Sequence, residues 1–198
     1  MYEYSEAVAL RDGSQATVRT TSPDDLRASL TFFLSMPEEE KQQMRIDVCD
    51  EETVARRYES IEKGKTVRLV AVCGDKIVGE GSLETMRYGW LRKSGEVRLL
   101  ILPEYRDLDV AKILAREIFL LAARHGLNNL ITRVRHDQTE MIEIFKGLHF
   151  RHEATQRDQV VDPEGWMHDL YMFTFDLAAM WRDLEDAVSS NASRHMDY

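Results

Sequence analysis

The sequence is poor in cysteine and proline, lacks long apolar runs and has fewer basic than acidic residues. Its two cysteines, Cys49 and Cys73, show no C-x-x-C spacing, which argues against a disulfide framework or a thiolate metal site and predicts reduced, packed thiols. No apolar stretch approaches the roughly 20 residues of a membrane-spanning helix. The N-terminus carries acids where a signal peptide has a basic region, so we expect a cytoplasmic protein that does not enter membranes.

The net charge of -9 also narrows the class of partner. Nucleic-acid binding needs a basic face that displaces counterions, and is therefore not expected. An acidic surface would accept a basic partner, but it also simply keeps many proteins from associating. A length of 198 residues suits one domain, which we place at residues 8–188 and follow with a flexible polar tail at 189–198.

Local signals predict an alternation of strands and helices. Ser22, followed by Pro23 and two acids, is typical of a helix N-terminus, and Gly64 and Gly126 suit helix ends. The Gly74-Asp75 pair between two valine-rich runs predicts a hairpin. We expect strands at residues 16–20, 66–73, 76–85, 95–102, 129–134 and 170–175, with one more from Phe150, and helices at 23–34, 50–64, 108–125, 138–148 and 176–188; segment 38–48 is ambiguous.

This order predicts an α+β, or α/β layered, fold with a mixed central sheet flanked by helices. At its centre, the strand GEVRLLIL ends at Pro103, which has no N–H to extend a sheet. The turn that follows, Arg106-Asp107-Leu108-Asp109-Val110-Ala111, leads directly into the longest helix. The start of this helix is therefore the first place to look for a binding site, because helix N-termini bind anions.

The stretch GEVRLLILPEYRDLDVAKILAREI, with MIEIFKGLHF after the next strand, resembles the GNAT superfamily of N-acetyltransferases. The resemblance extends from about Val8 to Leu177, and the opening LRDGSQATVRTTSPDDL is most similar to bacterial protein-lysine acetyltransferase domains. It implies a mostly antiparallel GNAT sheet and transfer of an acetyl group from acetyl-coenzyme A, as co-substrate, to a primary amine. Protein lysine, a small amine and an amino acid all stay open as acceptors. A homodimer, as is usual among relatives, is also implied.

The resemblance further implies where the coenzyme lies. The strand before the turn splays from its neighbour, so that its backbone can pair with the pantetheine arm and Ile101 can hold the acyl carbonyl. The amides of the following turn and helix start then bind the pyrophosphate. The residues so placed are Leu100, Ile101, Leu102, Arg106, Asp107, Leu108, Asp109, Val110, Ala111 and Lys112.

Asp109 departs from the pattern of the superfamily, which has glycine at that position of the turn. A carboxylate about 5 Å from a phosphate at an effective dielectric near 20 is repelled by roughly 3 kcal/mol. Two interpretations stay open. The helix start binds coenzyme A with help from Arg106 and Lys112, or Asp107 and Asp109 cap the helix and no ligand is needed.

This sequence has a counterpart for only one of the two catalytic groups that many GNAT relatives use. Glu96 corresponds to the general base of many relatives; the alternative is a strand residue that pairs with Arg98 or a neighbour, and Glu80 and Glu84 are weaker candidates. The tyrosine that serves relatives as general acid corresponds to Phe145, which has no proton to give.

Other residues carry weaker expectations. His149 stands where relatives have glycine, and histidine tolerates unusual backbone angles. Trp90 and Trp166 lie in predicted loops and either line an acceptor pocket or pack at an edge. The acceptor itself would be set by loops 38–50 and 87–94.

The histidines predict no bound metal, because none of them shows a metal-ligand spacing; they are His125, His136, His152, His168 and His195. The second reading of the whole chain is a noncatalytic GNAT-fold sensor or scaffold. Its coenzyme site would be weakened by Asp109, and its general acid lost at Phe145.

Overall fold

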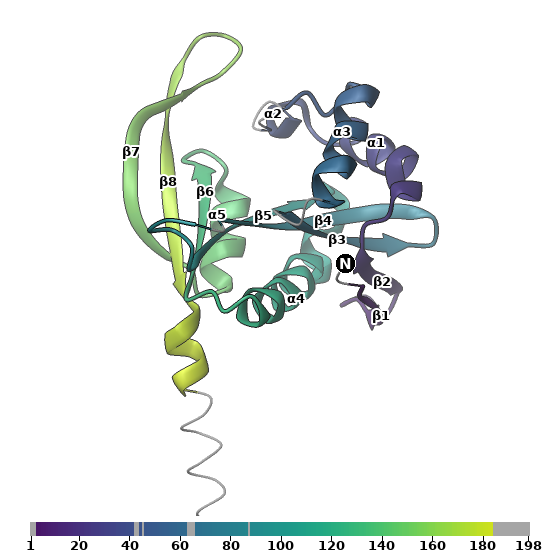
Figure 1. Ribbon diagram of the computed structural model, residues 1–198. Coiled ribbons are helices and arrows are strands. Elements are labelled where there is room, and N and C mark those ends of the chain that lie inside the picture. Colours follow the sequence, from purple (N-terminus) through teal and green to yellow (C-terminus); the bar gives the residue numbers. More distant parts are fainter. Residues whose placement is uncertain (1–2, 42–43, 45, 63–65, 87, 184–198) are drawn as a thin grey trace, which may run out of the picture.

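The computed structural model describes residues 3–41, 44, 46–62, 66–86 and 88–183. An eight-stranded sheet, in the order β1-β2-β3-β4-β5-β6-β8-β7, forms its centre (Figure 1). Six of the neighbouring strand pairs are antiparallel and one, β5 with β6, is parallel. The predicted mixed, mostly antiparallel sheet with flanking helices is therefore confirmed.

The strands and helices follow one another along the chain much as the local signals indicate. The strands are β1 Ser5–Ala9, β2 Gln15–Thr20, β3 Thr66–Cys73, β4 Lys76–Thr85, β5 Ser94–Ile101, β6 Asn129–Arg135, β7 Arg151–Val161 and β8 Met167–Asp176. The α-helices are α1 Leu26–Leu34, α2 Glu38–Lys41, α3 Glu51–Glu62, α4 Val110–Arg124 and α5 Thr139–Gly147, and two short 3-10 helices are η1 Pro23–Asp25 and η2 Pro103–Leu108.

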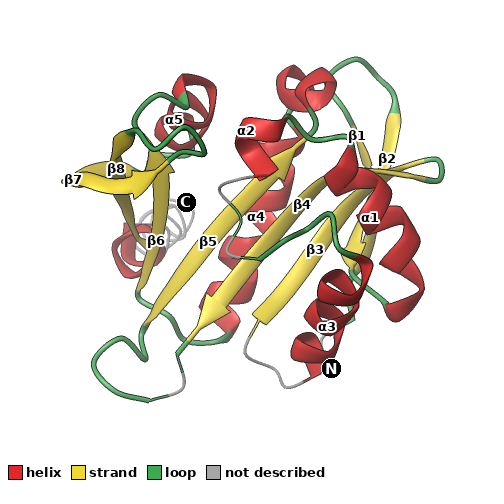
Figure 2. Ribbon diagram, turned by 90° about the horizontal axis from the view of Figure 1, so that it is seen from above, coloured by secondary structure: helices red, strands yellow, loops and turns green. Residues whose placement is uncertain are grey.

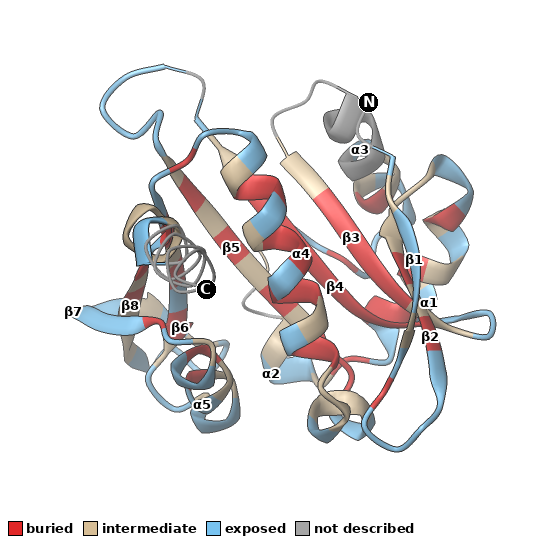
Figure 3. Cartoon of the chain, turned by 90° about the horizontal axis from the view of Figure 1, so that it is seen from below, coloured by how far each residue is buried: buried red, intermediate tan, exposed pale blue. Residues whose placement is uncertain are grey.

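Helices cover both faces of the central strands (Figures 1 and 2). Helix α4 packs on one face and buries a stripe that includes Leu114, Ile118 and Leu121, the apolar positions at helical spacing (Figure 3). On the other face, Phe32 and Phe33 of α1 pack with Val54 of α3 in a second apolar cluster. The sheet thus lies between two hydrophobic layers, and α4 is held firmly enough to fix the position of its N-terminus.

Glycine in β4 lets α4 approach the sheet closely. A Cβ atom at Gly81 would lie 2.8 Å from Cδ1 of Ile118, and one at Gly79 would lie 2.9 Å from Cγ1 of Val110. Real Cβ atoms do not approach carbon so closely, so larger residues would push the helix away. The alternating glycines of β4 therefore help to set where α4 begins.

Two helices end in the same backbone motif. Gly126 after α4 has φ 63° and donates its N–H to the carbonyl of Ala123, while His149 after α5 has φ 64° and donates to the carbonyl of Lys146. In each case the next residue donates back to the helix, which completes a Schellman motif. The prediction that His149 adopts an unusual backbone angle is confirmed.

Several sequence predictions need correction. Strand β1 was not predicted, because its exposed residues show little alternation, although Asp12-Gly13 marks the turn that joins it to β2. The helix expected from Pro23 starts as the 3-10 turn η1, and the long helix begins at Val110 because Leu108 belongs to η2. Cys49 is exposed, so the expectation of a packed thiol is wrong for that residue; Cys73 is half-buried, and burial raises its pKa.

Other predictions fall partly or wholly outside the described residues. The end of the second predicted helix at Gly64 and the tail at 189–198 lie there. The last predicted helix is present from residue 177 to residue 183, where the described part ends. Within the described ranges, no helix is both long and apolar enough to cross a membrane.

Candidate active site

Strands β5 and β6 separate shortly after they meet. Their parallel pairing covers only Ser94 with Asn129, Gly95 with Leu130 and Glu96 with Ile131, whereas β5 stays paired to β4 as far as Ile101. The two strands then diverge, as Figure 2 shows. The second half of β5 therefore has one side that no strand occupies, as the sequence comparison implied for a splayed strand.

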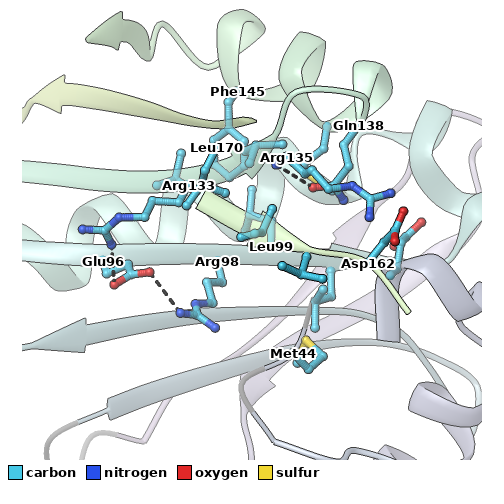
Figure 4. Close-up of a pocket in the computed structure, with 17 residues that line it drawn as sticks. Met44, Glu96, Arg98, Leu99, Arg133, Arg135, Gln138, Phe145, Asp162 and Leu170 are labelled. Atoms are coloured by element: carbon cyan, nitrogen blue, oxygen red, sulfur yellow. Dashed lines mark hydrogen bonds and ion pairs between the residues drawn. The ribbon is translucent and has the colours of Figure 1, made fainter. Parts of the chain in front are cut away.

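A cleft of about 390 Å³ lies where the strands part (Figure 4). Its wall combines β5, β6, the start of α5 and the hairpin of β7 and β8, and residues of the α2 region reach it from the opposite side. The lining residues are Glu40, Met44, Glu96, Arg98, Leu99, Leu100, Thr132, Arg133, Val134, Arg135, Gln138, Met141, Phe145, Val160, Val161, Asp162 and Leu170. The cleft is large enough for the arm of a cofactor and offers both apolar and charged contacts.

The backbone of β5 offers fewer free groups than the sequence suggested. The N–H of Leu102 donates to the carbonyl of Val78 at 3.0 Å, so this amide is already used. Because successive residues of a strand direct their backbone groups to opposite sides, those of Ile101 face away from β4. The Ile101 carbonyl accepts a hydrogen bond from Nε of Arg106 at 3.3 Å.

The start of α4 keeps the backbone conformation that the missing glycine would adopt. Asp109, at the N-cap position, has φ 63° and ψ 11°, which lie in the left-handed region. Its side chain makes no capping hydrogen bond to the helix and instead lies 2.7 Å from the ammonium of Lys112. Asp107 is exposed. Self-capping by Asp109 is therefore not found, and the first N–H groups of α4, which have no partner inside a helix, point out from its end.

Arg106 links three parts of the fold in front of this helix. Its guanidinium forms ion pairs with Glu40 of α2 and Glu140 of α5, besides the bond to the Ile101 carbonyl. Only 17% of the Arg106 side chain is exposed. An anion at the helix start would meet an arginine whose charge two carboxylates already offset.

Glu96 lies between two arginines at the point where the strands part. Its Oε1 accepts from Arg98 at 3.0 Å and its Oε2 lies 3.0 Å from Arg133 of β6, as Figure 4 shows. The alternative interpretation, in which Glu96 pairs with Arg98 or a neighbour, therefore describes its contacts, and Arg133 is a second partner. A base in this position would have to exchange one of these contacts for the substrate amine.

A second pocket, of about 950 Å³, shares Glu96 and Arg133 with the cleft. Glu84 of β4 directly faces Glu96 across the antiparallel pair and lines this pocket too. Like charges that face each other in a sheet are unfavourable, but here Arg98 and Arg133 offset the charge of Glu96. Tyr88 and Leu91, from the loop expected to select the acceptor, complete one side of the pocket.

Of four other candidate residues, two are buried in structural settings and two are exposed outside both pockets. Glu80 is buried and forms an ion pair of 3.2 Å with Arg68, so it is not available as a base. Phe145 lines the cleft but is buried, with its ring edge-on to Phe150. Trp90 and Trp166 are both exposed, and neither lines the two pockets described here.

Trp166 is nevertheless held at its backbone. Its N–H donates to Oδ1 of Asp162 at 2.7 Å, which fixes the turn between β7 and β8.

Comparison with solved structures identifies this architecture. An N-acetyltransferase from Staphylococcus aureus Mu50 superposes with a TM-score of 0.72 over 83% of this chain and 99% of its own, at 15% identity. The structure of yncA from Salmonella typhimurium, which holds its cofactor acetyl-coenzyme A, gives 0.69 over 82% and 94%, at 18% identity. The GNAT domain of S. lividans PAT gives a TM-score of 0.68 over 87% of this chain and 96% of its own, at 19% identity. The chain has the GNAT fold.

The sequence relationship is distant. No family model matches the chain, and no curated protein matches it. At these identities the GNAT fold is shared, while the resemblance to lysine acetyltransferases is one similarity among several, beside ribosomal-protein-alanine N-acetyltransferases such as that of Brucella melitensis. The comparisons therefore show the fold and leave the acceptor open.

Sequence reasoning missed the partners that surround the candidate residues. Arg133, Glu40 and Glu140 were not singled out, yet they contact Glu96 and Arg106. A weak signal existed for Arg133, because it alternates with the buried Thr132 and Val134 of β6 and must lie on the opposite face. Nothing in the local sequence indicated the contacts of Arg106, because Glu40 and Glu140 are far from it along the chain.

Proposed function

We propose that this protein is an acyl-coenzyme A dependent N-acetyltransferase that moves an acetyl group from acetyl-coenzyme A to a primary amine. The observation that carries the proposal is the early end of the β5–β6 pairing, which opens the cleft beside the part of β5 that leads, through η2, to the start of α4. A pantetheine arm along β5 would bring its pyrophosphate to the first amides of α4.

The chemistry requires a neutral amine and a carbonyl held in place. The amine nitrogen attacks the thioester carbon, the carbon–sulfur bond breaks, and coenzyme A leaves as the thiol after it gains a proton. Glu96 is the group proposed to take the proton from the ammonium form of the acceptor, directly or through water. Phe145 cannot return a proton, so the departing sulfur would receive it from water or from the acceptor itself.

The second pocket is the proposed entry of the acceptor. Glu84 and Glu96 place two carboxylates on one wall, and a cationic amine could exchange with Arg133, which lines the same pocket and pairs with Glu96. Met86, Tyr88 and Leu91 are exposed apolar residues at its edge and would contact the carbon skeleton of such an acceptor. A protein lysine and a small diamine both fit this description.

Isothermal titration with acetyl-coenzyme A at low and moderate salt tests the first step of the proposal. Micromolar binding that weakens with salt is expected, since the pyrophosphate is anionic. Amines can then be screened by release of the coenzyme A thiol. Absence of binding at both salt concentrations would overturn the proposal.

One observation favours the alternative, a noncatalytic GNAT-fold sensor or scaffold. Arg106 and Glu96, which an enzyme would need, are each paired with two oppositely charged groups. Coenzyme binding without turnover of any primary amine would support this second function. Turnover at the rate of an enzyme, on the order of 1 per second or faster, would exclude it.

A further inference from the structure

Two histidines that are far apart in the sequence meet beside the β7–β8 hairpin. His136 and Asp137 follow the last residue of β6, and His168 is the second residue of β8. Donor atoms of these three side chains all lie within 4.8 Å of one another. The backbone holds them there, because the N–H of His136 donates to the carbonyl of Asp169 at 3.0 Å.

Asp162 determines how the His168 ring is oriented. Its Oδ2 lies 2.8 Å from Nε2 of His168, while Nδ1 of the same ring lies 3.9 Å from Oδ2 of Asp137. A neutral ring that donates its one N–H to Asp162 presents the lone pair of Nδ1 to the Asp137 carboxylate. At 3.9 Å these two atoms are too far apart for a hydrogen bond, so each can direct a lone pair at a metal ion between them.

The outer contacts are those found around metal ligands. A histidine that binds a metal usually donates its other ring N–H to a carboxylate, as His168 does to Asp162. Asp162 is itself held, since its Oδ1 accepts the N–H of Trp166. Asp137 uses Oδ1 to accept from Arg135 at 2.6 Å, so its Oδ2 is the oxygen directed at His168.

Charge and donor type indicate which ion would bind. Two carboxylates, Asp137 and Asp162, outweigh the one guanidinium of Arg135, which contacts Asp137 alone. Two imidazole nitrogens and one carboxylate oxygen suit zinc and its neighbours in the first transition series, rather than magnesium or calcium. Three protein ligands leave a fourth, tetrahedral position for water.

We propose that His136, Asp137 and His168 form a binding site for a zinc-like divalent metal ion, with Asp162 as the residue that positions His168. Tetrahedral zinc would bring the donor atoms to about 3.3 Å from one another, so the side chains must close in by roughly 1 Å. His136 is exposed and can rotate to do this. The spacing along the chain predicted no metal site because the two histidines come from different strands.

The bound ion would tie two walls of the cleft together. Asp162, which lines the cleft, sits at the end of the hairpin, and Arg135, which also lines it, is the last residue of β6 (Figure 4). The metal would therefore hold the β7–β8 hairpin against the end of β6. This proposal does not depend on acetyl transfer.

Zinc titration of the full chain by calorimetry, without an affinity tag, tests the site. One ion per chain with micromolar affinity is expected, and cobalt should give the visible absorption of a tetrahedral complex. His136→Gln and His168→Gln should each weaken binding at least tenfold, and Asp162→Asn by 10- to 100-fold. His125→Gln, an exposed histidine at the end of α4, should bind like the parent. All proteins should carry Cys49→Ser, because that thiol is exposed.

The outcomes separate the proposal from incidental binding. Absence of zinc binding by the parent protein, or equal binding by parent and the His136→Gln/His168→Gln double variant, would overturn the site. Thermal unfolding monitored by circular dichroism provides the second readout: zinc should raise the Tm of the parent and of His125→Gln only. His136 is exposed, so His136→Gln should fold normally. If a His168 variant does not fold, the comparison of the parent with His136→Gln alone tests the site.

Discussion

Glu96 of β5, a member of the last residue pair that joins β5 to β6, forms an ion pair of 3.0 Å with Arg133 of β6. The pair bridges the two strands at the point where they part and where both pockets meet. The same carboxylate that is proposed to accept a proton therefore also holds the apex of the cleft. A substitution at Glu96 would therefore affect both proton transfer and the ion pair that joins β5 to β6.

Glu96→Gln should lower kcat about 100-fold and leave the KM for acetyl-coenzyme A within a few fold, because the amide keeps the shape of the side chain but cannot take a proton. Steady-state assays with a primary amine acceptor measure both constants. Glu84→Gln, on the facing strand, is the matched control and should mainly raise the acceptor KM. Full turnover by Glu96→Gln would remove Glu96 from the proposed role.

Asp109→Gly should tighten acetyl-coenzyme A binding by about tenfold, since a charge near the pyrophosphate is removed and glycine adopts the left-handed conformation without strain. Asp109→Asn, which loses the charge but keeps a side chain, should give part of this gain. Calorimetry at two salt concentrations measures the change. Asp107→Asn, at an exposed residue two positions earlier, reports the effect of net charge alone. No gain in either Asp109 variant would argue against a pyrophosphate at this helix start.

Glu140→Gln should strengthen coenzyme binding severalfold, because it frees part of the Arg106 guanidinium for the phosphate. Glu143→Gln is the matched control: it lies on the same helix α5, is similarly exposed and pairs with Lys146 instead. Calorimetric titration of both variants makes the comparison. If the two bind alike, the ion pair of Arg106 with Glu140 does not compete with the coenzyme.

Asp25→Asn should cost about 2 kcal/mol of stability at neutral pH, because Asp25 is buried and accepts two 2.6 Å bonds from Arg19 and one from the N–H of Ser22. Burial alone would raise the pKa of Asp25, but these hydrogen bonds outweigh it and lower the pKa below its usual value. The stabilisation is therefore complete above the unfolded-state pKa of about 3.9 and is lost as pH falls through the lower folded-state value.

Urea unfolding at several pH values measures this effect. The difference between the parent and Asp25→Asn should shrink in strong acid. Asp24→Asn, the exposed neighbour, should change stability by no more than about 0.5 kcal/mol. A difference that stays constant down to the lowest accessible pH would contradict the role of the ionised pair.

His149→Gly should stabilise the fold by about 1 kcal/mol. His149 holds φ 64°, and this left-handed conformation is unfavourable in free energy for residues with a Cβ atom. Gly126→Ala is the reverse test in the same motif after α4 and should destabilise by a similar amount. Only the flexible ammonium of Lys93 would lie near the new Cβ, so crowding contributes little. Thermal and urea unfolding give both values, and a loss of stability in His149→Gly would refute the argument.

Most secondary structure follows from local sequence. The Gly74-Asp75 turn, the helix ends at Gly126 and His149 and the strand that stops at Pro103 were predictable, because backbone angle and hydrogen-bond preferences belong to a few adjacent residues. The Asp12-Gly13 turn before β2 is also a local signal, but the residues of strand β1 itself carry none. This strand is exposed and forms because β2 offers it a partner.

The candidate site was predictable only in outline. The sequence by itself determined the order of the strands and main helices from β2 onward, while the splayed strand and the glycine position that Asp109 occupies were implied by the resemblance to GNAT proteins. Only the tertiary structure decided that Arg106 contacts Glu40 and that Glu96 contacts Arg133, and it also brought His136 to His168. The physical reason is that an ion pair forms between whichever charges the packed strands and helices place within reach, and that distance in space is set by the sheet order rather than by separation along the chain.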